Sequence, residues 1–243
     1  MIVLPVGGHI EGYSAIAVDF DGTDRMARGA GLTGAADAKV GIFSTWVMFQ
    51  AGDGNAMTFF GAPGGSGLNI ERQATNIFRV VGWIAGSGNV LIMAGSTAVT
   101  ADSTWHHIAM SWDLGNALGH VSLDGVDDVA GGATLTDQNI DYTTSDAHLM
   151  SNSSAGQIVD AFVSEYYLNL AEYLDITVPA NLQKLRLATG KPADPGSDGS
   201  TVTGSAPTIM HNNPVASWHT NTGGGGGMTL TGTLAAASSS PSD

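Results

Sequence analysis

The stretch at residues 104–126, TWHHIAMSWDLGNALGHVSLDGV, decides the fold class of this chain. Residues 106–112 alternate with the two-residue period of a β-strand, and large apolar side chains share one face while small ones share the other: Ile108, Met110 and Trp112 against Ala109 and Ser111. A second strand is expected at 119–123, and Asp124 with Gly125 then supplies a hairpin turn. The stretch therefore predicts antiparallel strands with one buried face.

Similar short segments recur along the chain between glycine-rich breaks, which is typical of an all-β sandwich. Further strands are expected at 15–20, 42–49, 57–60, 77–84, 89–94 and 157–168. The segment 42–49 is apolar on both faces, so it is either a central strand or a strand with one face against a subunit. One short helix is expected at 179–188, where Pro179 suits the first turn.

Composition and charge restrict the function. The length of 243 residues fits one large β-sandwich, or one domain with an appendage, and only 12% of the residues are charged against roughly 25% in average proteins. Such a surface suits a subunit of a larger assembly. The net charge is −14, with no Lys or Arg between Arg79 and Lys184. Nucleic-acid binding is therefore disfavoured, because it needs clustered cations.

Targeting and redox signals are not evident in the sequence. There is no cysteine, which excludes disulfides and thiolate chemistry. The first fifteen residues have no cationic segment followed by a sustained apolar run, so no signal peptide is expected. No apolar run approaches the roughly 20 residues that span a bilayer, so no membrane insertion is expected. The protein is expected to be made in a cytoplasm and to stay there or leave inside a particle.

The central stretch resembles the signature of laminin-G/concanavalin-A-like jelly-rolls, in which a Trp-His-His strand ends in Trp-Asp and the next strand ends in Leu-Asp-Gly. The matching residues are Trp105, His106, His107, Trp112, Asp113, Asp124 and Gly125. Residues 17–26 resemble the opening strand of that family, and residues 158–175 resemble the closing strand. The resemblance implies a jelly-roll of two antiparallel sheets over 1–178. The remainder, 179–243, is expected to be a short helix and an extended Gly/Ser/Pro-rich assembly segment.

Residues 179–243 also resemble the C-terminal part of laminin-G-like proteins of tailed bacteriophages. That resemblance implies a virion structural component (decoration, spike, collar or fibre protein) that is assembled in the host cytoplasm. It also implies a homo-oligomer whose partners are other virion proteins. The alternative is a carbohydrate-binding module that recognises a bacterial surface glycan, and a remote alternative is a glycoside hydrolase. On the first hypothesis, deletion of 223–243 leaves a folded domain with impaired assembly.

Three groups of polar residues are candidate metal or catalytic sites. His106 and His107, near Asp113, point to opposite faces of a strand and so cannot share a ligand easily; packing explains them better. The second and third groups are two acidic clusters: Asp19, Asp21 and Asp24, then Asp124, Asp127 and Asp128. Turns at Asp21-Gly22 and Asp124-Gly125 explain these clusters better than a calcium loop does. We therefore expect no metal and no cofactor.

Catalytic motifs are absent from the sequence. A jelly-roll glycosidase needs closely spaced carboxylates on one strand, and the four glutamates, Glu11, Glu71, Glu165 and Glu172, do not form such an array. The expectation is a non-enzyme without catalytic residues. Aromatic side chains could stack on sugars, and the candidates are Trp46, Trp83, Trp105, Trp112, Trp218, Tyr166 and Tyr167. Most lie within strand patterns and are better explained as core, with Trp218 the exception, so no ligand-binding residue is assigned.

Overall fold

The hairpin expected at 104–126 is present in the computed structural model, which describes residues 13–62 and 67–243. Strand β8 (His106–Asp113) pairs antiparallel with β9 (Leu118–Leu123), and β10 (Val126–Asp127) turns back along β9. The turn residues Asp124 and Gly125 have φ angles of +53° and +85°. Two consecutive positive φ angles are the requirement of the tight turn that best matches strand twist, which explains the Asp-Gly pair.

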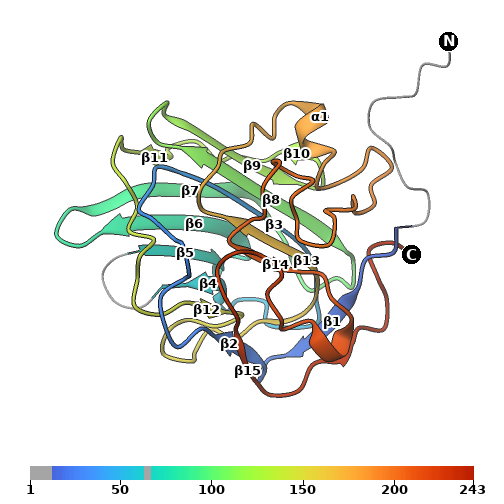
Figure 1. Ribbon diagram of the computed structural model, residues 1–243. Helices are drawn as coiled ribbons and strands as arrows, with labels where there is room; N and C mark the ends of the chain where they lie inside the picture. Colours follow the sequence, from blue (N-terminus) through green and yellow to red (C-terminus); the bar gives the residue numbers. More distant parts are fainter. Residues whose placement is uncertain (1–12, 63–66) are drawn as a thin grey trace, which may run out of the picture.

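The chain folds into two antiparallel sheets that pack face to face (Figure 1). Sheet A has the order β10-β9-β8-β3-β13-β1-β16, and β14 also pairs with β13. Its remaining strands are β1 (Ala17–Asp21), β3 (Val40–Phe49), β13 (Asp160–Asn169), β14 (Ile209–His211) and β16 (Ala235–Ala236). The expected central strand is therefore β3, which lies between β8 and β13.

Sheet B has the order β11-β7-β6-β5-β4-β12-β2-β15. Its strands are β2 (Arg25–Ala27), β4 (Met57–Gly61), β5 (Gly67–Arg72), β6 (Ile77–Ile84), β7 (Gly88–Ala98), β11 (Thr134–Leu135), β12 (His148–Leu149) and β15 (Thr229–Thr231). The all-β fold class and the two antiparallel sheets predicted from the sequence are confirmed.

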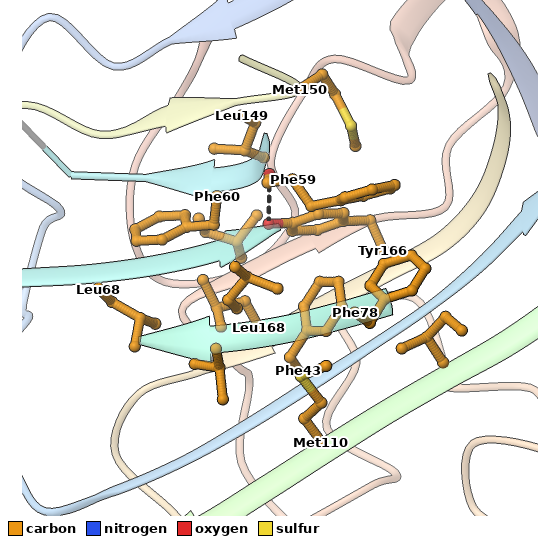
Figure 2. Packing of buried hydrophobic residues seen from close by; sticks show 14 of the residues in the cluster. Phe43, Phe59, Phe60, Leu68, Phe78, Met110, Leu149, Met150, Tyr166 and Leu168 are labelled. Carbon is orange, nitrogen blue, oxygen red and sulfur yellow. Dashed lines mark hydrogen bonds between the residues drawn. The ribbon is translucent and has the colours of Figure 1, made fainter. Parts of the chain in front are cut away.

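The main core lies between the sheets, where the inward-facing residues of both sheets meet. Figure 2 shows aromatic rings from both sheets in the core. Phe43 and Tyr166 of sheet A meet edge to face at 5.5 Å between ring centroids, and Phe43 meets Phe59 of sheet B at 6.4 Å. The Tyr166 hydroxyl donates to the backbone oxygen of Phe59 across the sandwich at 3.2 Å. Trp112 is also fully buried, and its indole N–H donates to the Tyr142 hydroxyl at 2.9 Å. Gly41 is required here, because a Cβ on it would lie 2.2 Å from the Trp112 ring.

We expect Tyr142→Phe to destabilise the fold by about 2–3 kcal/mol. The Tyr142 hydroxyl accepts a hydrogen bond from the Trp112 indole N–H and donates one to the Val40 carbonyl, each at 2.9 Å. Removal of the hydroxyl therefore leaves the buried indole N–H and the carbonyl without these partners. The matched control is Tyr166→Phe, which loses one bond to a carbonyl and should cost about 1 kcal/mol. Urea unfolding of both variants measures the difference, and equal losses would contradict this account.

A third layer covers the outer face of sheet A. We call residues 171–208, which connect β13 to β14, the cover segment. It contains helix α1 (Pro179–Leu182), which is shorter than the helix expected at 179–188. Apolar residues of this segment and of the sheet form a second buried cluster: Ile42, Ala109, Tyr167, Leu174, Ile176, Leu185, Val202 and Met210. The outer face of β3 is therefore covered by the chain itself, which explains why 42–49 is apolar on both faces.

The C-terminal residues extend both sheets. β14 pairs with the second half of β13, while β15 pairs with β2 and β16 pairs with β1. The end of the chain is tied to its start, since the Ser240 hydroxyl donates to the Ala15 oxygen at 2.8 Å. The division into 1–178 and 179–243 stays a prediction, but three short strands of the second part belong to the sheets of the first. Within the described residues, no helix is long and apolar enough to cross a membrane.

Candidate functional site

A pocket of about 170 Å³ lies on the outer face of sheet A, between β9 and the cover segment. We call it the β9 pocket. It is lined by His120, Val121, Ser122, Gly125, Asp127, Ile176, Thr177, Pro179 and Leu182. Figure 1 shows α1, which ends in Leu182, beside the β9–β10 end of the sheet.

The alternation of β9 points its polar side chains at the pocket. Val121 belongs to the main core, so His120 and Ser122 on either side of it project from the outer face. Asp127 pairs with Ser122 across the β9–β10 hairpin and therefore lies on the same face. The Asp124-Gly125 turn thus brings a carboxylate next to the serine.

The opposite wall comes from residues 175–182 of the cover segment. The Asp175 carboxylate accepts from the Thr177 N–H at 3.0 Å and from its hydroxyl at 2.6 Å, which closes a tight turn. This turn buries Ile176 in the second cluster and leaves Thr177 exposed. Pro179 then begins α1, and Leu182 ends it. One wall of the pocket is therefore polar and the other is mainly aliphatic.

The polar wall offers hydrogen bonds to a ligand. Ser122 is only 3% exposed, and its Oγ has no hydrogen-bond partner among the described residues. A buried hydroxyl without a partner is unfavourable by about 1–3 kcal/mol, so a ligand group that displaces the atoms covering it and bonds to it gains affinity. His120 Nε2 lies 3.0 Å from the Tyr173 hydroxyl and 3.9 Å from Asp175 Oδ1, which fixes the ring at the edge of the pocket.

Unpartnered polar atoms concentrate between sheet A and the cover segment. Eleven buried side-chain nitrogen or oxygen atoms lack a partner in the part of the chain that the structure describes. Six of them are in this layer: Trp46 Nε1, His107 Nδ1, Ser111 Oγ, Ser122 Oγ, Glu165 Oε2 and Arg186 Nε. Of these six residues, Ser122 lines the β9 pocket. The layer opens at the β9 pocket and also at a smaller pocket lined by Glu165, Tyr167 and Leu185.

Three large exposed apolar residues are close in sequence to residues of the β9 pocket. The large hydrophobic residues exposed within residues 13–62 and 67–243 are Val126, Val178 and Leu118, at 67%, 42% and 38%. Val126 lies between the pocket residues Gly125 and Asp127, and Val178 lies between Thr177 and Pro179. Leu118 begins β9. Val126 pairs with Leu123, which packs against the main core, so Val126 points away from the pocket face, whereas Leu118 shares the outer face of β9 with His120 and Ser122.

The two histidines singled out in the sequence do point to opposite faces. His106 Nδ1 bonds to Asp124 Oδ2 at 2.7 Å, and this hydrogen bond raises the pKa of His106. His107 is fully buried under the cover segment, where its Nε2 meets the Ser44 hydroxyl at 2.9 Å. Burial, together with the charge of Arg186, lowers the pKa of His107 to about 3. Neither histidine lines the pocket.

The first acidic cluster stays together, since the pKa of Asp19 is raised by burial and by the charges of Asp21, Asp160 and Asp24, whereas the second cluster separates. Asp21 accepts from Thr23 and forms the turn after β1, while Asp24 is buried and accepts from the Thr233 N–H at 2.7 Å. Asp128 accepts from the Ser96 and Thr97 hydroxyls. Asp127 is the one acidic candidate at the β9 pocket. Within the described residues, no three His, Asp or Glu side chains are grouped closely enough to hold a metal ion.

The glutamates lie on different elements. Glu71, on β5 of sheet B, accepts hydrogen bonds from Arg79 and Asn69. Glu165, on β13 of sheet A, accepts a hydrogen bond from the Tyr13 hydroxyl. Glu172, in the cover segment, accepts from Ser205. Glu11 lies outside the described residues. That the protein is not an enzyme stays a prediction.

The aromatic candidates are mostly core residues, as expected, and Trp218 is one of them. Trp218 is fully buried, stacked on His211 at 5.0 Å between ring centroids and packed against Phe20. The prediction that Trp218 lies outside the core was therefore wrong. Its position between β14 and β15 looks irregular in sequence but closes one end of the sandwich. Trp83 and Trp105 are half-buried. None of the seven aromatic candidates lines the β9 pocket.

Sequence reasoning missed most residues of the pocket. The polar pair His120 and Ser122, two residues apart on a predicted strand, was the available signal for an outward-facing polar wall. No sequence pattern indicates that Ile176, Thr177 and Pro179, more than fifty positions later, lie against it.

This architecture is an all-β jelly-roll sandwich of two antiparallel sheets. No protein-family model matches the chain, and no curated protein matches it by sequence. Among solved structures, a "putative carbohydrate binding protein" of Bacteroides ovatus has a TM-score of 0.64 and 10% sequence identity. The alignment covers 94% of this chain and 62% of that one, so this chain spans about three fifths of the length of that protein.

Two further solved structures are similar to a smaller part of the chain. A heptameric SAP-like pentraxin from Limulus polyphemus has a TM-score of 0.47 and 11% identity, covering 67% of this chain and 79% of that chain. The LG1-3 region of the laminin alpha2 chain also has a TM-score of 0.47, with 10% identity over 68% of this chain and 34% of that one. At these identities the similarity is one of fold.

Proposed function

We propose that this protein is a non-catalytic binding module for a glycan and that the β9 pocket receives one sugar of that glycan. The observation that carries the proposal is the buried, unpartnered Ser122 hydroxyl on the wall of a pocket with mixed polar and apolar lining. A sugar has hydroxyl groups for Ser122, His120 and Thr177, and C–H groups for the aliphatic wall. The Bacteroides ovatus structure, similar in fold over 94% of this chain, is consistent with a glycan ligand.

The size of the pocket limits what it can hold. A volume of about 170 Å³ is below the roughly 300–1,000 Å³ of sites for drug-sized ligands. One ring therefore fits, and the rest of the glycan lies outside. With so few contacts, the dissociation constant for a single sugar should be about 1 mM. Useful affinity then requires several copies of the module or a longer glycan.

A glycan array followed by calorimetry on the best ligand tests this function. Ser122→Ala should weaken binding about tenfold, because one buried hydrogen bond contributes about 1–1.5 kcal/mol. Ser151→Ala is the matched control, since Ser151 is also fully buried with an unpartnered hydroxyl but does not line the pocket. It should leave the affinity unchanged.

Two results would contradict the proposal in different ways. If the wild-type protein binds no glycan on the array, glycan binding is wrong. If it binds but Ser122→Ala and Ser151→Ala have equal affinity, the glycan occupies another site.

The virion role stays a prediction that rests on the resemblance of residues 179–243 to bacteriophage proteins. It is compatible with glycan binding, since a particle can present many copies of a weak binding module. Co-sedimentation of the protein with purified particles, and its mass by analytical ultracentrifugation, would test the particle and the homo-oligomer separately.

A further inference from the structure

The aliphatic wall of the β9 pocket is unusual for a site that would stack a sugar ring. Its apolar side chains are those of Ile176, Pro179 and Leu182. No Phe, Tyr or Trp is among the lining residues, and the one aromatic ring there is the imidazole of His120. Ile176 is part of the second cluster, and Leu182 packs against that cluster. This wall is therefore a fixed extension of a hydrophobic core, and it favours a ligand that has an alkyl group of its own.

The polar wall lies opposite, on sheet A. Ser122 and His120 project from β9, and Thr177 stands at the edge of the cover segment. A ligand that satisfies both walls has hydroxyl groups on one side and an apolar substituent on the other. A plain hexose places a hydroxymethyl group against the aliphatic wall, where its hydroxyl loses water without gaining a partner.

Charge restricts the ligand further. Asp127 lines the pocket, and Asp175 forms the turn behind it. Asp127 makes no salt bridge with any described residue. Arg186 lies against Gly125. Burial raises the pKa of Asp124, but its hydrogen bonds from His106 and from the His107 N–H lower it, and the charge of Arg186 adds a smaller lowering. In a chain with a net charge of −14, these carboxylates disfavour an anionic ligand.

We propose that the β9 pocket selects a neutral terminal sugar that carries a methyl group, either a 6-deoxyhexose or an N-acetylhexosamine. The methyl group lies against Ile176, Pro179 and Leu182, and the ring hydroxyls bond to Ser122 and His120. This inference rests on the proposed function, because it names the sugar class of that same site.

Matched sugar pairs test the inference in the wild-type protein. L-fucose is compared with L-galactose, L-rhamnose with L-mannose, and N-acetylglucosamine with glucose, by ligand-observed NMR titration. The methyl-bearing member of at least one pair should bind about fourfold tighter, as expected for one buried methyl group. The first two pairs differ by a methyl group in place of a hydroxymethyl group, and the third differs by a whole acetamido group in place of a hydroxyl. Glucuronic acid should bind more weakly than glucose.

A variant locates the preference. Leu182→Asn keeps the branching and the number of heavy atoms of the side chain but makes the wall polar. The two sugars of the responsive pair should then bind with about equal affinity. Leu118→Asn is the control, because Leu118 is an exposed leucine on the same face of β9 and does not line the pocket. It should keep the preference, and melting curves of both variants establish that they are folded.

The outcomes separate this inference from the proposed function. Equal affinity within all three pairs, with glycan binding intact on the array, overturns the methyl selectivity alone. A preference that survives Leu182→Asn overturns its assignment to this pocket. If no sugar binds in either experiment, both the inference and the proposed function are wrong.

Discussion

Deletion of residues 223–243 is expected to abolish cooperative folding at 37 °C. The sequence alone predicts a dispensable assembly segment here, because the stretch is rich in Gly, Ser and Ala. In the structure, β15 pairs with β2 at the edge of sheet B, and β16 pairs with β1 at the edge of sheet A. The segment therefore joins the two sheets, and its removal exposes the unpaired backbone of β1 and β2.

That truncation leaves one buried group without its partner and removes one core side chain. Asp24 is 2% exposed, and its carboxylate accepts from the Thr233 N–H at 2.7 Å. Met228 belongs to the main core. Loss of a buried carboxylate's partner, a core side chain and two strand pairings amounts to more than about 5 kcal/mol, which is comparable with the whole stability of many domains.

Thermal unfolding followed by circular dichroism measures the effect. A shorter deletion of 238–243 is the control, because it removes end contacts such as the Ser240–Ala15 hydrogen bond but leaves β15 and β16 in place. It should lower stability by only about 1–3 kcal/mol. A 223–243 deletion that melts like the full-length chain but fails to self-associate would instead favour the assembly segment.

The sandwich could be predicted from the sequence because its signals are local. Alternation over 106–112 and the Asp124-Gly125 turn are properties of neighbouring residues, and both are confirmed. The apolar residues on both faces of 42–49 indicated burial on both sides, but they could not distinguish a partner subunit from the chain itself. That choice depends on contacts with Leu185 and Met210, more than 130 positions away.

The cover segment was missed for a related reason. Leu174, Ile176 and Val202 are isolated apolar residues among turns, with neither helical nor strand periodicity. The local sequence around such residues indicates a loop. They form a hydrophobic core only because they pack against the outer face of sheet A. The β9 pocket lies where the cover segment meets sheet A, so it could not be predicted from local sequence either.

Glu165 is the position where local sequence and global fold disagree most. It interrupts an apolar run that predicts a strand, and the structure places it in a β-bulge at a φ of +51°. At this point the neighbour of β13 changes from β1 to β14. The side chain is buried beneath the cover segment beside Ser44 and Leu185, and the Tyr13 hydroxyl donates to its Oε1 at 2.5 Å.

Burial raises the pKa of Glu165 from 4.5 to about 8. The unfolded chain releases this proton near pH 4.5, whereas the folded protein retains it until about pH 8. Over that interval the folded state binds more protons than the unfolded state, so stability falls as pH rises. The loss begins near the unfolded pKa and is complete above the folded pKa.

Glu165→Gln should remove this pH dependence. The amide keeps an oxygen acceptor for Tyr13 and carries no charge at any pH, so the variant should match the wild type near pH 4.5. Between pH 5 and pH 8.5 its stability advantage should grow by roughly 3–4 kcal/mol, from 1.36 kcal/mol per pKa unit. Urea unfolding at half-unit steps of pH measures the two curves.

Tyr13→Phe provides the opposing variant. The hydrogen bond from Tyr13 lowers the pKa of Glu165, so its removal should raise that pKa further and extend the loss of stability above pH 8. It should also destabilise the fold below pH 5, where the bond to a neutral carboxyl group is lost. Parallel curves for the wild type and Glu165→Gln would mean that the carboxyl group is ionised in the folded protein. Glu165 would then be in contact with water or polar groups beneath the cover segment and not in an apolar environment.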